Sequence, residues 1–141
     1  MIEMMNALRV CIGSNDGVLI APTHMGDTRE FFIYDVCGQH EANFIGVRTN
    51  TAIDMEHGCN EKMKTILRIL SDVDVFVGKK NSLNFRRIAA DTKHQPIVVN
   101  AQAVAEALLL IQKSFSEIER MVAQRQSSAR SVNIPEFRLD A

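Results

Sequence analysis

Five side chains of the types that bind anions and soft metals stand out in this sequence: His24, His57, Cys59, Lys79 and Lys80. Imidazole and thiolate groups are ligands of iron–sulfur and related soft metal centres. Lysine ammonium groups add positive charge that attracts an anionic ligand. All five are candidate cofactor-binding residues, and His24 and Cys59 are the candidate metal ligands among them.

The elements that must position these residues alternate between two patterns along the chain. Runs of β-branched and aromatic residues predict strands at residues 8–13, 30–36, 43–49, 73–77 and 96–99. Apolar residues at helical spacing predict a helix over residues 59–71, and Ser82 is a predicted N-cap for a second helix. Asn100 is a predicted cap for one long final helix, whose apolar stripe is Val104, Ala107, Leu108, Ile111, Phe115, Ile118 and Val122.

The order β-β-β-α-β-α-β-α predicts an α/β fold with a mixed five-stranded sheet and helices on both faces. Residues 30–36 and 43–49 are expected to form a hairpin, and the strands around Val10, Val75 and Val98 to run parallel. We expect one domain over residues 1–126 and a flexible tail over residues 127–141, where Ser, Arg, Asn and Pro predominate.

This topology predicts that the candidate residues converge at one edge of the sheet. The loops at residues 22–29 and 50–58, the start of the first helix and the Gly78-Lys79-Lys80 turn all fall at the carboxyl ends of the parallel strands. Open α/β sheets commonly bind ligands at that edge. Helix N-termini there add unpaired N–H groups and a positive dipole end, which favour an anionic ligand.

A zinc site is a competing interpretation. Cys37-x-x-His40 and His57-x-Cys59 together have the spacing of a four-ligand zinc set. The predicted hairpin, however, holds the two pairs at opposite edges of the sheet, roughly 20 Å apart. One ion could not bridge them, so the zinc site is the less favoured reading. Cys11, in the middle of a strand, is expected to be a small core residue.

Composition excludes several classes of protein. The formal net charge is −1, which provides no broad field for nucleic acid or anionic lipid. No apolar run approaches the ~20 residues needed to cross a bilayer, and the N-terminus lacks the pattern of a signal peptide. Three widely spaced cysteines indicate free thiols in a reducing compartment. We therefore expect a cytoplasmic protein with no nucleic-acid or membrane partner.

Several segments resemble the dinitrogenase iron–molybdenum cofactor biosynthesis family, which includes the NifX-type carriers and the C-terminal part of NifB. The similar segments are Arg9-Val10-Cys11-Ile12-Gly13-Ser14, Thr23-His24-Met25-Gly26, residues 31–36 and residues 59–78. Met25 stands where the family usually has Phe. The likeness spans roughly residues 9–121, and the order and spacing of the segments carry it.

The resemblance implies a ribonuclease-H-like three-layer fold and a non-enzymatic carrier. Such a carrier holds an iron–sulfur or iron–molybdenum cluster, or its precursor, transiently and passes it to cofactor-assembly or nitrogenase proteins. It implies His24 as the best-supported ligand position, and Cys59 resembles a cysteine that NifB-like members place before the first helix. The chain lacks the three-cysteine radical motif of full-length NifB.

Three other functions compete with a carrier. A ribonuclease-H-like nuclease needs clustered carboxylates, but Asp16, Asp35, Asp72 and Asp74 are predicted to lie at both edges of the sheet. A dinucleotide enzyme would need a Gly-x-Gly-x-x-Gly motif after the first strand, which is absent. A protein-interaction or regulatory module without a cofactor, docking through the long final helix, stays open as the alternative. The sequence does not indicate an oligomeric state.

Overall fold

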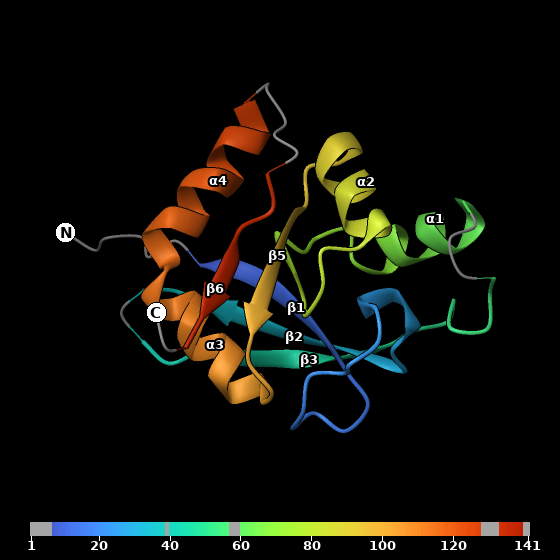
Figure 1. Cartoon of the computed structure of the whole chain (residues 1–141), viewed down its shortest axis with the longest axis horizontal. Coiled ribbons are helices and arrows are strands. Elements are labelled where there is room, and N and C mark those ends of the chain that lie inside the picture. The colour runs from blue at the N-terminus through green and yellow to red at the C-terminus, as the bar shows by residue number, and fades with distance from the viewer. Residues whose placement is uncertain (1–6, 39, 57–59, 128–132, 140–141) are drawn as a thin grey trace.

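The computed structural model describes residues 7–38, 40–56, 60–127 and 133–139, and its centre is one mixed sheet. The six described strands lie in the order β3-β2-β1-β4-β5-β6 (Figure 1). They are β1 (Leu8–Ser14), β2 (Glu30–Val36), β3 (Asn43–Thr49), β4 (Val75–Gly78), β5 (Gln95–Asn100) and β6 (Glu136–Arg138).

Strand β1 joins the two halves of the sheet. It pairs antiparallel with β2, where Leu8 faces Val36, and parallel with β4, where Val10 faces Val75. β2 and β3 pair antiparallel as the predicted hairpin, and β4 and β5 pair in parallel. The predicted parallel arrangement of the strands around Val10, Val75 and Val98 is therefore confirmed.

The sixth strand corrects the predicted count of five. β6 pairs in parallel with β5, and Phe137, opposite Val99, packs against the core. This strand lies in the segment whose composition predicts a tail. Three residues are too few to show the alternation that marks a strand, and only the open edge of β5 gives them a pairing partner.

Helices cover both faces of the sheet, as predicted. α1 (Asn60–Ile69) and α2 (Leu83–Asp91) pack on one face, and α3 (Val104–Lys113) and α4 (Phe115–Ser127) pack on the other (Figure 1). A short 3-10 helix, η1 (Met25–Asp27), lies between β1 and β2. Within the described part of the chain, no helix has both the length and the apolar character needed to span a membrane.

The predicted single long helix is instead two helices. Ser114 ends α3 with φ −101° and ψ 17°, and α4 starts at the next residue. The apolar stripe continues across this break, so periodicity alone does not reveal it. The predicted cap Asn100 is the last residue of β5. The start of α3 is instead capped by the Glu106 carboxylate, which accepts hydrogen bonds from the Gln102 and Ala103 amides.

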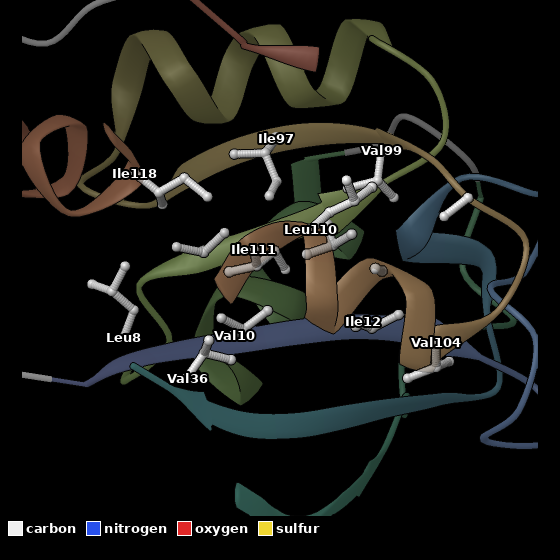
Figure 2. Close-up of a cluster of buried hydrophobic side chains, with 14 of the residues drawn as sticks. Leu8, Val10, Ile12, Val36, Ile97, Val99, Val104, Leu110, Ile111 and Ile118 are labelled. Atoms are coloured by element: carbon white, nitrogen blue, oxygen red, sulfur yellow. The ribbon is translucent and has the colours of Figure 1, made fainter. Parts of the chain in front are cut away.

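Alternation along β1 divides the core into two clusters. Val10 and Ile12 face α3 and α4 and meet Ile97, Val99 and Ile111 there (Figure 2). Cys11 points to the opposite face, where it packs with Phe31 and Phe76 beneath α1 and α2. Because successive strand side chains point to opposite faces, a strand buried on both faces must be apolar throughout its centre. This confirms Cys11 as a core residue, with none of its surface exposed.

A charge cluster ties β1, β2 and β3 to the turn between α1 and β4. The Arg9 guanidinium donates to Asp35 at 2.9 Å and to Asp72 at 2.9 Å. Arg48 donates two hydrogen bonds to Asp72, at 2.6 and 2.9 Å. These guanidinium groups hold the pKa of Asp72 well below its ordinary value. Asp35, Asp72 and Asp74 lie around Arg9, while Asp16 lies beyond the other end of β1, so the predicted dispersal of the acids over both edges is confirmed.

His94 packs in a partly buried position before β5. Its ring stacks on Phe76 with centroids 4.6 Å apart, and its Nδ1 lies 2.6 Å from the Val73 carbonyl oxygen. Burial lowers the pKa of His94 and outweighs the Val73 carbonyl and Asp74, which raise it. The folded protein therefore holds the imidazole neutral at pH values where the unfolded chain would protonate it.

This pKa shift predicts that the fold loses stability as pH falls through the ordinary titration range of histidine. The unfolded state then binds more protons at His94 than the folded state does, so protonation favours unfolding. In His94→Gln, which keeps a hydrogen-bond donor near the Val73 carbonyl, this part of the pH dependence should disappear.

Chemical denaturation at several pH values measures the effect. Burial also raises the pKa of Asp74, which acts in the opposite sense in acid, so the difference between wild type and His94→Gln isolates the imidazole. Identical pH dependence in the two proteins would contradict the assignment.

Candidate functional site

The candidate site lies at the edge of the sheet where the parallel strands β1, β4 and β5 end. Ser14, Gly78 and Asn100 are the last residues of these strands. β2 begins at the same edge, because Glu30 pairs with Ser14, and β3 ends there, because Thr49 pairs with Glu30. The long connection from β1 to β2 must therefore lie at this edge of the sheet (Figure 1).

The first half of that connection is held against the start of α3. The Ser14 hydroxyl donates to the Leu19 carbonyl at 2.6 Å and accepts from the Gly17 amide. The Asp16 carboxylate accepts from the Val18 and Leu19 amides, and these bonds lower its pKa. Ile20 then donates to the Gln102 carbonyl. The loop is a defined turn with its backbone groups paired.

The second half, which carries η1, is held by Asn50. This side chain is almost fully buried, and its Nδ2 donates to the Gly26 and Thr28 carbonyls at 2.9 and 2.8 Å. Gly13 lets η1 approach β1 closely, because a Cβ at this position would lie 2.8 Å from Oγ1 of Thr28. His24 directly precedes η1. It therefore lies next to a segment that is held by Asn50 and packed against β1 at Gly13.

His24 lines a pocket between η1, α1 and α2. The open space between these elements is about 430 Å³, including solvent at its mouth. Its wall combines one imidazole, two thioethers, one charged pair and one aromatic ring, from His24, Met25, Asp27, Lys62, Met63 and Phe85. Imidazole and thioether groups suit a soft metal centre, and the apolar wall favours a ligand with little hydration.

Lys62 and Asp27 form an ion pair within this wall. Nζ of Lys62 lies 2.6 Å from Oδ1 of Asp27, and only 5% of Lys62 is exposed. A buried ammonium group needs a nearby carboxylate to offset its lost hydration. The pair therefore fixes the distance between α1 and η1, and with it the width of the pocket.

Lys79 and Lys80 extend the site along the same edge. A second hollow shares His24, Met25 and Phe85 with the first pocket and adds both lysines to the lining. Gly78 lets the Phe85 ring pack against the end of β4, because a Cβ at residue 78 would lie 2.8 Å from this ring. Ser82 then caps α2 as predicted, its hydroxyl accepting from the Phe85 amide at 3.1 Å.

Three of the five candidate residues, His24, Lys79 and Lys80, thus line one hollow. The side chain of Lys79 also donates to Oε1 of Gln102 at 2.8 Å, which ties it to the start of α3. His57 and Cys59 lie outside the described residues. Their roles remain those predicted from the sequence, although α1 begins at Asn60, directly after them.

Cys11 lies beneath the site but does not present a thiolate. Its sulfur is 3.9 Å from the sulfur of Met25, and its side chain is fully buried. Burial raises the pKa of the Cys11 thiol far above its ordinary value, so the group stays protonated at neutral pH. It acts as a packing residue below Met25.

Cys37 and His40 lie at the opposite end of the sheet. They follow β2, whose last residue, Val36, pairs with the first residue of β1. Neither residue lines the pockets that contain His24. Among the described residues, no three His, Cys, Asp or Glu side chains are grouped so that they could hold a metal ion.

Asn50, Asp27 and Lys62 contribute to the site but are not identified by the sequence patterns. Asn50 lies in a predicted loop, where asparagine is common and carries no signal of burial. Lys62 falls within the predicted first helix, where a lysine is usually exposed. Only the position of η1 against α1 creates the pair between Lys62 and Asp27.

One family model matches the part of the chain that contains the candidate site. The family model described as dinitrogenase iron-molybdenum cofactor matches residues 6–114, which include β1 to β5, α1 to α3 and every candidate site residue. No curated protein matches the chain. The family match supports a role in the biosynthesis or binding of the iron–molybdenum cofactor. It covers well over half of the sequence, and the chain therefore belongs to the dinitrogenase iron-molybdenum cofactor family.

Proposed function

We propose that this protein is a non-enzymatic carrier that binds an anionic iron–sulfur or iron–molybdenum cluster, or a precursor of it, and transfers it to another protein of cofactor assembly. The observation that carries the proposal is the shared hollow of His24, Lys79 and Lys80, in a chain of this family. The cluster is cargo in this proposal and is released again.

The chemistry of this hollow and of the adjoining pocket between η1, α1 and α2 suits such a cargo. The His24 imidazole is a ligand for a metal at the surface of the cluster, and the Met25 and Met63 thioethers offer soft, polarisable contacts to its sulfides. Lys79 and Lys80 offset the negative charge of the cluster. Cys59, next to the first residue of α1, is the proposed thiolate ligand, with His57 as a further cofactor-binding residue.

The openness of the site favours transfer over storage. The described part of the pocket contributes one imidazole ligand on a loop, in place of a closed set of four ligands. Fewer protein ligands leave more of the cluster accessible to an incoming acceptor. The Asn50 and Lys62 contacts keep the loop in position, so binding does not require the loop to be ordered first.

The first test is a histidine pair. In an anaerobic titration with an iron–sulfur cluster or iron–molybdenum cofactor preparation, the wild-type protein should bind stoichiometrically. His24→Ala should weaken binding by about tenfold or more, because it removes a metal ligand. His40→Ala, at the opposite end of the sheet, should bind like wild type. Visible absorption and metal analysis give the affinity. Equal affinities for all three proteins would exclude His24 as a ligand.

A cysteine pair tests the proposed thiolate. Cys59→Ala should bind the cluster more weakly than wild type, because a thiolate is the stronger soft ligand. Cys37→Ala removes a thiol at the opposite edge and serves as the matched control. If the two variants lose affinity equally, or neither does, Cys59 is not a ligand.

The lysines should act through charge. Lys79→Gln/Lys80→Gln should weaken cluster binding and reduce its dependence on salt concentration, because the field that attracts the anion is removed. Lys93→Gln/Lys113→Gln makes the same change in net charge with two exposed lysines outside the hollow. Titration at two salt concentrations gives the comparison. An identical loss in both double variants would show that only net charge matters.

A further inference from the structure

Strand β3 is an edge strand with little protection against pairing beyond one irregularity in its register with β2. Among the described strands it pairs only with β2, and its other side faces no strand of the sheet (Figure 1). It is seven residues long, Asn43–Thr49. Natural proteins protect such edges with lysine, proline or inward-pointing charges, because the unpaired backbone groups otherwise bind another strand.

The side chains of β3 are suited to a neutral partner. Phe44, Ile45 and Val47 are 53%, 41% and 42% exposed. The strand contains no Lys, Pro, Asp or Glu. Its one charged residue, Arg48, is engaged within the molecule by Asp72 and by the Ile69 carbonyl. The edge therefore presents no uncompensated charge that would repel an identical strand.

An apolar surface continues from this edge onto β2. The Phe44 ring lies 5.4 Å from the Tyr34 ring and 6.5 Å from the Phe32 ring, measured between centroids. Tyr34 also packs against the core cluster under α3 and α4, so these aromatic side chains lie on the α3 side of the sheet. Antiparallel pairing about a two-fold axis perpendicular to the sheet would join this surface to its copy on the same side.

From these observations we propose that β3 pairs antiparallel with β3 of a second copy of this chain, forming a dimer with one continuous sheet. Self-pairing satisfies the edge backbone groups and buries Phe44, Ile45 and Val47, and it meets no charge repulsion. A second copy fits because the exposed side chains of the strand are mainly apolar and its one charge, on Arg48, is compensated by Asp72. An acidic or basic peptide would meet no complementary charge on this strand.

The dimer is expected to be weak and reversible. The register between β2 and β3 shifts at Ile33/Tyr34, so Ile45 has no partner on β2 and the edge bends there. This shortens the stretch that pairs without interruption. A single strand edge also buries less surface than the roughly 1,600 Å² of a standard stable interface.

Sedimentation velocity over a wide concentration range tests the proposal. The apparent mass should rise with concentration from that of the 15.8 kDa monomer toward twice that value. Ile45→Lys should keep the protein monomeric, because it places a charge at the pairing edge. Leu83→Lys, an equally drastic change at an exposed residue of α2, should dimerise like wild type. Circular dichroism checks that both variants fold.

Hydrogen exchange provides a second measurement that does not depend on a variant. Amides of residues 43–49 should become more protected as concentration rises, whereas those of β6, at the other edge, should not change. A monomer at every concentration up to the millimolar range would overturn the proposal. So would a dimer that persists in Ile45→Lys or is lost equally in Leu83→Lys.

Discussion

The pairing of β1 with two strands of opposite direction is the constraint on which the rest of the structure depends. β1 runs antiparallel to β2 and parallel to β4, and Val10, Cys11 and Ile12 are completely buried between the two helical layers. Burying one such aliphatic side chain contributes about 1.5–3 kcal/mol, so any shift of β1 would lose several of these contributions at once. With β1 fixed, its C-terminal end and that of β4 must lie side by side.

The candidate site follows from this placement through two close approaches. η1 packs against the end of β1 because Gly13 has no side chain to keep Thr28 away, and the Phe85 ring packs against the end of β4 because Gly78 has none. His24 is therefore held near Lys79 and Lys80 by backbone packing. The ion pair of Lys62 and Asp27 then fixes α1 against η1. The described part of the candidate site is therefore positioned by the packing of these elements.

Ion pairs join elements that are far apart in the chain, and one of them, between Lys62 and Asp27, lies in the wall of the candidate site. Asp72, in the turn before β4, accepts hydrogen bonds from Arg9 and Arg48, and Asp35 accepts from Arg9, so these pairs stabilise the fold. At the site end, the Lys79 ammonium group donates to the neutral side-chain amide of Gln102.

The sequence by itself determined the order of the elements, the parallel core strands, the Ser82 cap and the edge of the sheet that carries His24, Lys79 and Lys80. These follow from local periodicity, which depends on neighbouring residues, and from the right-handedness that almost all β-α-β crossovers share. Only the tertiary structure decided the break at Ser114, the strand β6 and the burial of Asn50 and Lys62. The last three depend on contacts between residues far apart in the chain: β6 needs the open edge of β5, Asn50 needs the Gly26 and Thr28 carbonyls, and Lys62 needs Asp27. The local sequence pattern does not reveal such contacts, because asparagine and lysine residues are usually exposed in folded proteins.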